Sequence, residues 1–306
     1  MRFDWPEDTP EKFSHEIISA KHDWHKDEKF SDDGIADLLD RYPRENLGLY
    51  SFPDHAEGRV KAMHGRALDL SGAELIRAVK KGRIWLNLRA VNKYLPEYEE
   101  IKQRLFSNLD SAAHIKTLKQ DVGVLISSPH IHVHYHLDIP LVCLVQLRGE
   151  KTVYLYPAKA PFATAEQIEA VVLREQEEEM LYQHGFEDYV AKIDMKPGDA
   201  ITWPQNAPHR VQNSDMMNVS LSCEYMTPTA LLRANALYTN GVLRRSMGMD
   251  ATLPKGGGVD LLSKAILARG IKLFRKTPDK QITPITFEID KNTLEVTPLQ
   301  EIVAAE

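Results

Sequence analysis

A segment of alternating histidines is the first place where this chain could do chemistry. It reads His130-Ile-His-Val-His-Tyr-His-Leu-Asp138. If the segment is a β-strand, residues two apart lie on the same face, so His130, His132, His134, His136 and Asp138 would point to one side. Imidazole and carboxylate groups that converge on a cavity can bind a transition metal. We therefore predict a metal site on this face.

A second segment, residues 197–213, could supply a ligand from far along the chain. A Gly-Asp turn leads there to a short apolar strand, a proline-rich corner and a single histidine, His209. Pro204 and Pro208 restrict the backbone on both sides of the corner. A stiff corner of this kind can hold one ligand against the histidine strand.

Short runs of β-branched and aliphatic residues, separated by turn residues, surround both segments. They lie at residues 122–126, 141–147, 152–156, 200–203 and 219–225. This spacing predicts an all-β sandwich or barrel. A stretch rich in Glu and Gln, residues 165–185, interrupts the pattern and predicts an inserted helix. We interpret its acidic cluster, Glu175 with residues 177–179, as a solvated face, with a substrate lid as the alternative.

Both ends of the chain predict additions to this β-rich centre, so the expected fold is mainly β with helical additions. Ser31 can cap a helix that runs to Asp40, and Ser71 with Glu74 matches a capping box for a helix that ends at Gly82. Further expected elements are a strand at 83–88, a helix at 95–109, two helices after residue 228, the second at 260–276, and a hairpin at 282–296. The predicted parts are an N-terminal α/β elaboration (1–110), a barrel (111–227) and a C-terminal helical pair with a terminal hairpin (228–306).

Composition and charge exclude several classes of partner. The chain has 306 residues, with 38 Lys and Arg against 44 Asp and Glu, so its net charge of −6 provides no basic field for nucleic acid. We interpret the basic residues of the last helix as a solvated face rather than as a membrane or nucleic-acid surface. The sequence contains no apolar run of about 18 residues and no secretory signal. Cys143 and Cys223 lie in apolar runs and are expected to be buried thiols. We therefore expect a cytoplasmic protein without a nucleic-acid or membrane partner.

The two chemical segments resemble motifs of a known family. Residues 198–213 resemble the second cupin motif, with Asn206 in place of a glycine; the residues that fit in register are Gly198, Pro204, His209 and Asn213. Asn tolerates the left-handed backbone that glycine often supplies there. The upstream segment departs from the usual cupin pattern, which has Glu after its His-x-His.

His136-Leu-Asp138 resembles instead the His-x-Asp of cupin-like, JmjC-type 2-oxoglutarate oxygenases. An apolar strand and the run Gln-Leu-Arg-Gly-Glu-Lys151 follow it, as in the asparaginyl-hydroxylase and ribosomal-oxygenase branches of that family. The resemblance covers roughly residues 120–227. It implies a double-stranded β-helix (jelly-roll or cupin) core.

The resemblance also implies a reaction and its residues. Fe(II) would be bound by His136, Asp138 and His209, which leaves coordination positions for cosubstrate and oxygen. Lys151 would anchor the distal carboxylate of 2-oxoglutarate, and a buried ammonium is costly without such an anion. The enzyme would be a dioxygenase that hydroxylates a protein side chain or a small metabolite. The C-terminal helices would form a homodimer, as in relatives.

Some family features are absent, and alternatives follow from them. Family members often have a hydroxyl residue three positions before the first ligand, where this chain has Val133. Thr152, Tyr154, Ser220 or Ser222 could supply this hydroxyl, and we take Thr152 and Ser222 as candidates for cosubstrate binding. His134 is a candidate substrate contact or, alternatively, a fourth metal ligand.

Arg210 and Arg148 are candidate anchors for an anionic substrate, with solvated surface as the other interpretation of each. Two other functions remain open at this level. The first is a metal cupin of another class, such as an isomerase, a lyase or a dioxygenase without a cosubstrate, using Zn, Mn, Ni or Fe. The second is a binding protein without catalytic activity that has kept the barrel.

Overall fold

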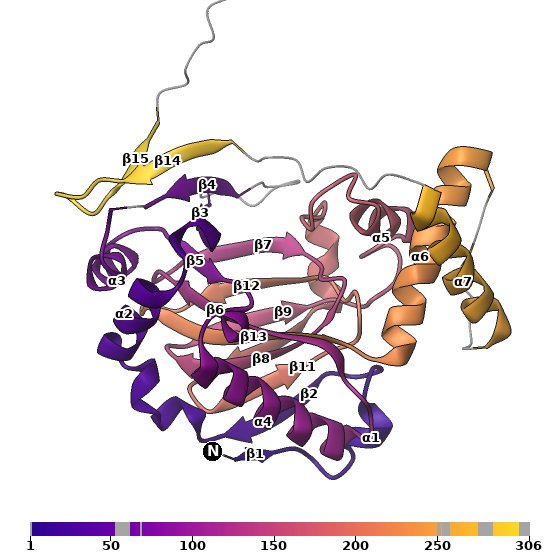
Figure 1. Ribbon diagram of the computed structural model, residues 1–306, viewed down its shortest axis with the longest axis horizontal. Helices are drawn as coiled ribbons and strands as arrows, with labels where there is room; N and C mark the ends of the chain where they lie inside the picture. The colour runs from indigo at the N-terminus through magenta and orange to yellow at the C-terminus, as the bar shows by residue number, and fades with distance from the viewer. Residues whose placement is uncertain are drawn as a thin grey trace, which may run out of the picture.

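Two facing β-sheets and the helices around them make up the computed structural model of this protein (Figure 1). The structure describes residues 2–52, 62–67, 69–249, 252, 258–274 and 284–299. The strands are β1 (Phe3–Asp4), β2 (Ile18–His22), β3 (Leu47–Ser51), β4 (Met63–Arg66), β5 (Trp85–Leu88), β6 (Leu118–Ser127), β7 (His132–His136), β8 (Leu141–Arg148), β9 (Lys151–Leu155), β10 (Ala191–Met195), β11 (Asp199–Thr202), β12 (His209–Asn213), β13 (Asn218–Met226), β14 (Ile285–Ile289) and β15 (Val296–Pro298).

The helices lie mostly before and after the central strands. They are α1 (Thr9–Lys12), α2 (Asp32–Arg41), α3 (Gly72–Lys81), α4 (Pro96–Ala113), α5 (Ala165–Val172), α6 (Pro228–Met247) and α7 (Val259–Phe274). Short 3-10 helices lie at Trp24–Lys26, Glu28–Phe30, Arg44–Asn46, Val91–Lys93 and His184–Tyr189.

Strands β6 to β13 are divided between the two sheets in the manner of a double-stranded β-helix. The larger sheet contains the order β11-β8-β13-β6, and the smaller sheet has the order β10-β9-β12-β7. Side chains that point inward from both sheets form one apolar cluster, which includes Leu144 of β8 and Val153 of β9. The predicted jelly-roll core is confirmed.

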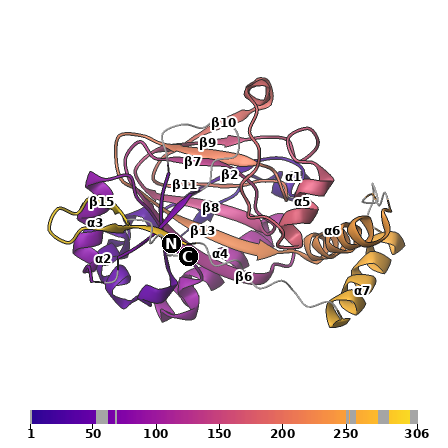
Figure 2. The ribbon, with the colours of Figure 1, turned by 90° about the horizontal axis from the view of Figure 1, so that it is seen from above.

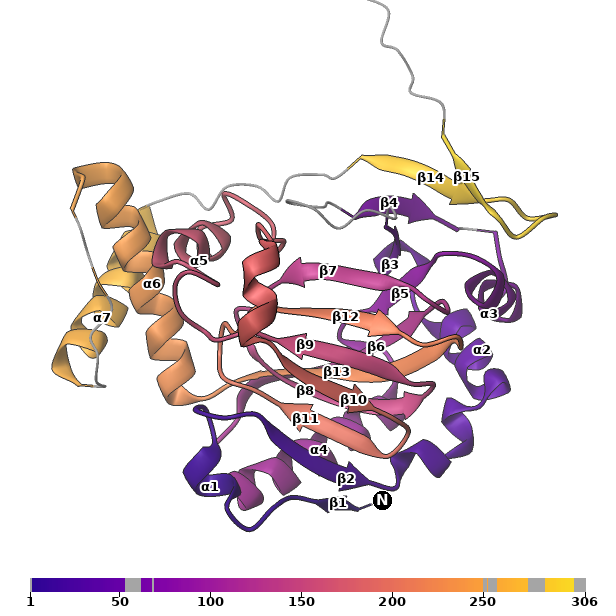
Figure 3. The same cartoon turned by 180° about the vertical axis from the view of Figure 1, so that it is seen from behind.

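The N-terminal part of the chain extends and covers the larger sheet. Strands β1 and β2 continue it beyond β11, and β5, β3, β4 and the hairpin β14–β15 continue it beyond β6 (Figure 3). Helices α2, α3 and α4 lie on its outer face (Figure 2), where Leu75 and Leu105 belong to the same buried cluster as Leu221 of β13. Phe3 and Phe287 also belong to this cluster, so residues from all three predicted parts share one core. The boundaries of these parts as domains stay a prediction.

Local signals in the sequence correctly predict where α2 and α3 begin. The Ser31 hydroxyl accepts a hydrogen bond from the Gly34 amide at 3.2 Å and caps α2. Ser71 and Glu74 form the expected capping box of α3, in which the Ser71 amide donates to the Glu74 carboxylate at 2.7 Å. Each pair satisfies backbone groups that a helix end leaves without partners.

The predicted helix at 165–185 is wrong beyond its first two turns. Thr164 and Gln167 form a capping box for α5, but the helix ends at Val172 and Arg174 adopts a positive φ of 59°. The Glu-rich residues that follow supply no apolar stripe to continue the helix along the protein surface. Met180 instead donates its amide to the Tyr135 carbonyl at 2.9 Å, so this part of the insertion runs along the edge of β7.

The C-terminal prediction is correct in outline. Helices α6 and α7 lie side by side at one end of the molecule (Figure 1). The hairpin β14–β15 turns at Asp290, whose carboxylate accepts hydrogen bonds from the Asn292 and Thr293 amides. The predicted end of the second helix, at Arg275 and Lys276, lies outside the described residues. None of the helices in the described ranges is both long enough and apolar enough to cross a membrane.

Substituting Gly149, in the turn between β8 and β9, should destabilise the protein. Gly149 has φ +71°, and a Cβ atom there would lie 2.5 Å from the Met217 carbonyl oxygen. We expect Gly149→Ala to lower the free energy of unfolding in urea by about 1–3 kcal/mol. Gly185→Ala is the control, because a Cβ atom at Gly185 meets nothing within 4 Å. Equal stability of the two variants would contradict this account of the turn.

Candidate metal centre

Three side chains from two strands of the smaller sheet meet at the mouth of the barrel. His136 ends β7, Asp138 follows it, and His209 begins β12 directly opposite His136 in the strand pairing. One ligand atom from each of the three residues lies within 4.8 Å of the others. The His209 Nε2 and Asp138 Oδ2 atoms are 3.4 Å apart, and the two imidazole centroids are 4.1 Å apart. The sequence-predicted His-Asp-His triad is therefore brought together.

Backbone carbonyls orient both imidazoles for metal binding. The Nδ1 atom of His136 lies 2.7 Å from the His134 carbonyl oxygen, and that of His209 lies 3.2 Å from the Ala207 oxygen. A carbonyl only accepts, so each Nδ1 carries the proton and each Nε2 presents its lone pair to the centre. Burial and the neighbouring His136 lower the pKa of His209 to about 4. His209 is therefore neutral at neutral pH, as a metal ligand must be.

The proline-rich corner before β12 is tied to the backbone of Asp138. Asn206 has φ +62°, the left-handed conformation that its place in the cupin motif predicts. Its side-chain amide donates to the Asp138 carbonyl at 2.9 Å, and that of Gln205 donates to the Ile139 carbonyl at 2.9 Å. The aspartate and His209 are thus held together through the corner.

Lys151 lies inside the barrel without an anionic partner. Its side chain is on the inward face of β9 with Val153 and Leu155, and the residue is only 7% exposed. Within the part of the chain that the structure describes, its ammonium has no hydrogen bond or ion pair, and burial alone lowers its pKa to about 7. An unpaired ammonium in an apolar interior is costly, and a carboxylate ligand would offset that cost.

The alternation of the histidine strand is broken, which corrects the expectation that five groups share one face. His132 pairs with Gln212, whereas His136 pairs with His209. Two residues, His134 and Tyr135, therefore lie opposite the single residue Arg210. This mismatch is a β-bulge. The bulge places His132 on the outer face, where Arg210 contributes to lowering its pKa.

The two remaining histidines are not ligands of this centre. Among the described residues, the group that could hold a metal consists of His136, Asp138 and His209. His134 is buried and packs edge-on against Phe52, with ring centroids 5.3 Å apart. His130 lies in the turn before β7 with φ +56°. The fourth-ligand alternative for His134 therefore fails, and its contact with substrate stays a prediction.

Thr152 and Arg210 point away from the centre, so their predicted roles are corrected. The Thr152 hydroxyl donates to the Asp194 carboxylate at 2.6 Å on the outer face of the smaller sheet. Arg210 lies on that face too, where it pairs with Glu187 at 2.7 Å and covers the ring of Tyr154. Neighbouring residues of a strand face opposite sides. Because Lys151 and His209 point inward, Thr152 and Arg210 point away from the metal centre.

The two remaining polar candidates, Arg148 and Ser222, differ in whether they could still contact a ligand. Arg148 forms an ion pair of 2.6 Å with Asp32, so its charge is already paired with a carboxylate of the protein. Ser222 lies on the inward face of β13, opposite Gly123 and Leu144, and remains a candidate for cosubstrate binding.

Acidic residues near the centre were missed by the sequence analysis. Glu178 and Glu179 are half-buried beside His136, so a fully solvated face is wrong for this part of the acidic cluster. Burial and the Asp138 charge raise the pKa of Glu178. They also raise the pKa of Glu224 to about 7. Glu224 follows Ser220 and Ser222 at a spacing of two along β13, a polar alternation that could have revealed it.

Comparison with known proteins gives a structural relative but no sequence match. No protein-family model matches this chain, and no curated protein matches it in sequence. A solved structure of ycfD from Escherichia coli is similar over 92% of this chain and 71% of that chain, with 17% identity and a TM-score of 0.51. The chain has the fold of ycfD.

Two further structures of ycfD are also similar to this chain. One, described as a ribosomal oxygenase, matches with 16% identity and a TM-score of 0.50 over 92% of this chain and 70% of that chain. Another, in complex with cobalt and 2-oxoglutarate, has 17% identity and a TM-score of 0.49 over 89% and 68%. At such identities the likeness to ycfD is one of fold, and it confirms the cupin-type fold that the motifs predict.

The affinity for Co(II) should distinguish substitutions of the inward His136 and His209 from a substitution of the outward His132. We expect His136→Ala and His209→Ala to weaken Co(II) binding by more than about 100-fold, because each removes a ligand rather than a supporting contact. His132→Ala should bind Co(II) like the unmodified protein, because the bulge turns His132 away. Optical titration with Co(II) measures this, and an equal loss in all three variants would overturn the assignment of faces.

Proposed function

We propose that this protein is an Fe(II)- and 2-oxoglutarate-dependent dioxygenase that hydroxylates a protein side chain or a small metabolite. The observation that supports it is one barrel that contains both a His-Asp-His triad and a buried ammonium for which the described residues supply no partner. Two imidazoles and one carboxylate suit a divalent transition metal. The ammonium suits a carboxylate.

The roles of the residues follow from their positions. His136, Asp138 and His209 would hold Fe(II), and Lys151 with Ser222 would bind the cosubstrate. When bound, Fe(II) would activate molecular oxygen, the oxidant, with 2-oxoglutarate as the two-electron donor: one oxygen atom would enter a substrate C–H bond and the other would enter succinate, with loss of carbon dioxide. The chain itself orients the ligands through the His134 and Ala207 carbonyls and encloses the cosubstrate in an apolar interior. Enclosure of this kind keeps water from the reacting groups.

The fold of ycfD supports the proposal. That protein is described as a ribosomal oxygenase, and it has been crystallised with cobalt and 2-oxoglutarate. A ribosomal protein is therefore one substrate to test, beside amino acids and small metabolites. Free, buried Cys143 and Cys223 fit a reducing compartment, and we propose the cytoplasm as the location.

We also propose a homodimer through the C-terminal helices. Several large apolar side chains of α7 are exposed; they are Val259, Leu262, Ile266, Leu267, Leu273 and Phe274, of which Phe274 is 90% exposed. Exposed apolar patches of this kind often mark interfaces between proteins. A second copy of the same helix would cover the patch on both partners.

Turnover of 2-oxoglutarate should require the charge of residue 151. With Fe(II), we expect the unmodified protein to convert 2-oxoglutarate to succinate and Lys151→Met to lose at least about 100-fold in kcat/KM for 2-oxoglutarate, since a buried charge pair is removed. Lys192→Met on the neighbouring strand β10 is the matched control. Succinate release measures the reaction. If Lys151→Met keeps full metal-dependent activity toward another substrate, the protein is a metal cupin of another class.

Binding of 2-oxoglutarate should weaken as the pH rises above neutrality. The pKa of Lys151 is about 7 without ligand, so its charged form is present below that pH and lost above it. A bound carboxylate favours the ammonium and raises its pKa, so binding takes up a proton. We expect affinity to fall by up to about tenfold per unit between about pH 7 and 9.

Calorimetry in two buffers of different ionisation enthalpy measures both the affinity and the proton uptake. Lys151→Arg keeps a permanent charge, so any binding that it retains should lose this pH dependence. An affinity of the unmodified protein that is constant over this range would contradict the role of Lys151.

A further inference from the structure

A short segment of the insertion lies against the strand that supplies the first metal ligand. We call residues 175–180 the strap. The Leu137 amide donates to the Glu178 carbonyl at 3.1 Å, and the Met180 amide donates to the Tyr135 carbonyl at 2.9 Å. These two bonds lie on either side of His136, which is bridged to Glu179. Since β7 is the last strand of the smaller sheet, the strap covers its open edge at the position of the ligand.

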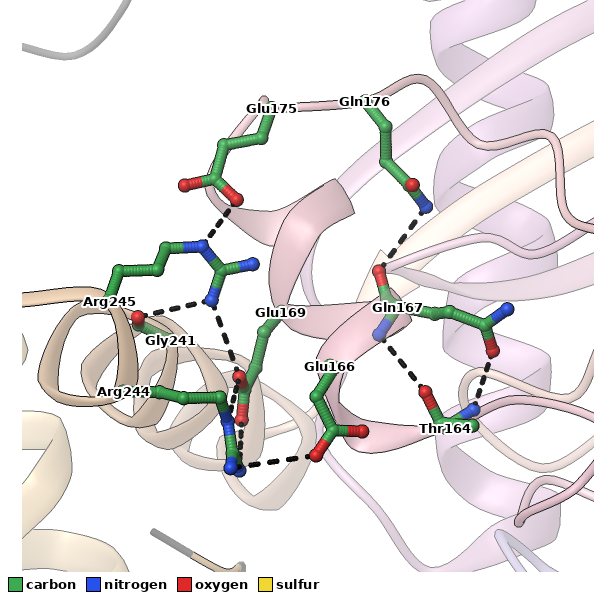
Figure 4. A network of polar contacts seen from close by, with 9 residues as sticks. All are labelled: Thr164, Glu166, Gln167, Glu169, Glu175, Gln176, Gly241, Arg244 and Arg245. Carbon is green, nitrogen blue, oxygen red and sulfur yellow. Dashed lines mark hydrogen bonds and ion pairs between the residues drawn. The ribbon is translucent and has the colours of Figure 1, made fainter. Parts of the chain in front are cut away.

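The far end of the strap is held by the C-terminal helix α6. Figure 4 shows Arg245 of α6 between two carboxylates, that of Glu175 at the start of the strap and that of Glu169 in α5. The Arg245 Nε atom lies 2.5 Å from the Glu175 carboxylate, and its Nη1 atom lies 3.5 Å from that of Glu169. Arg244 also pairs with Glu169, at 3.0 Å. One helix thus holds both α5 and the strap.

Burial makes this ion-pair network strong. The Glu169 side chain is fully buried, with 0% exposure, and two arginines neutralise it. Removing one partner of a buried pair leaves an uncompensated charge, which is far more costly than losing a surface pair. The side chains at the end of α5 also pack closely on α6, because a Cβ atom on Gly241 of α6 would lie 2.7 Å from the Leu173 side chain. Helix α6 therefore contacts both the end of α5 and the start of the strap.

We propose that Glu169, Arg245 and Glu175 are positioning residues of the metal centre. They transmit the placement of the C-terminal helices to the strap, and the strap transmits it to His136 through the two backbone hydrogen bonds. Helix α7 in turn supports α6, because the Thr239 hydroxyl of α6 donates to the Lys264 carbonyl of α7 at 2.8 Å. The catalytic consequence rests on the proposed function, whereas the mechanical link between helix and ligand does not.

Amide hydrogen exchange of the full-length, metal-free protein tests the link directly. We expect Glu175→Gln and Arg245→Met to speed exchange at Leu137 and Met180 by about 5- to 50-fold, since the strap opens more often. Amides of α2, at the other end of the molecule, should exchange as before. Arg245→Lys keeps the charge, so its exchange rates should lie between those of the unmodified protein and those of Arg245→Met. Because Glu175 and Arg245 are each about 30% exposed, both variants should fold even if Glu169→Gln does not.

Glu166→Gln is the matched control. Glu166 is on the same helix as Glu169 and pairs with Arg244 at 3.5 Å, but its side chain is 57% exposed. Such a pair contributes little, so exchange at Leu137 and Met180 should not change. Unchanged exchange in Glu175→Gln and Arg245→Met would overturn the proposal, and so would an equal increase in Glu166→Gln.

The affinity for Co(II) tests whether the strap acts on the ligand. We expect the two strap variants to bind Co(II) about 3- to 10-fold more weakly, less than for a group bonded directly to a ligand side chain. Faster exchange with unchanged Co(II) affinity would overturn the action on His136. Neither measurement needs 2-oxoglutarate. Absence of turnover in the unmodified protein, with both responses present, would therefore reject the proposed reaction and support the link.

Discussion

The antiparallel pairing of β7 with β12 is the constraint on which the rest of the site depends. It places His136 directly opposite His209, although the two residues are far apart in the chain. Asp138 joins them because it follows the end of β7 and is bonded through its backbone to the corner that precedes β12. The jelly-roll arrangement is what makes this pairing possible, since the chain crosses between the two sheets before it returns beside β7. The triad is thus a consequence of strand order as much as of residue type.

Charged groups of opposite sign lie in different parts of the barrel. Lys151 lies at the start of β9, beside an apolar cluster, while Asp138 and Glu224 lie near each other and near Arg89. An isolated charge in such surroundings is unstable unless a counter-ion is bound. A divalent cation at the carboxylate end and a dicarboxylate reaching the ammonium end would neutralise both. The charges of the barrel and those of the proposed ligands therefore complement each other.

The helical additions support the barrel at its weakest edge. Strand β7 has a neighbour on only one side in the smaller sheet, and an edge strand of this kind is easily distorted. Two ionic networks hold the insertion beside it: Arg210 with Glu187 on the outer face of the sheet, and Glu169 with the two arginines of α6. The first network attaches the insertion to β12, the strand that begins with His209, and the second attaches it to α6. The insertion and the C-terminal helices are in this sense part of the construction of the site.

Sequence alone determined the features that depend on neighbouring residues. The caps at Ser31 and Ser71, the left-handed Asn206 and the identity of the three ligand residues all follow from local backbone chemistry or from short motifs. Strand alternation could also have argued against Thr152 once Lys151 was expected to point inward, because adjacent residues of a strand face opposite ways. The bulge in β7, the extended strap and the burial of Glu178 needed the tertiary structure. Alternation along one strand cannot reveal these features, since which face is inside, and whether the register slips, depends on the partner strand.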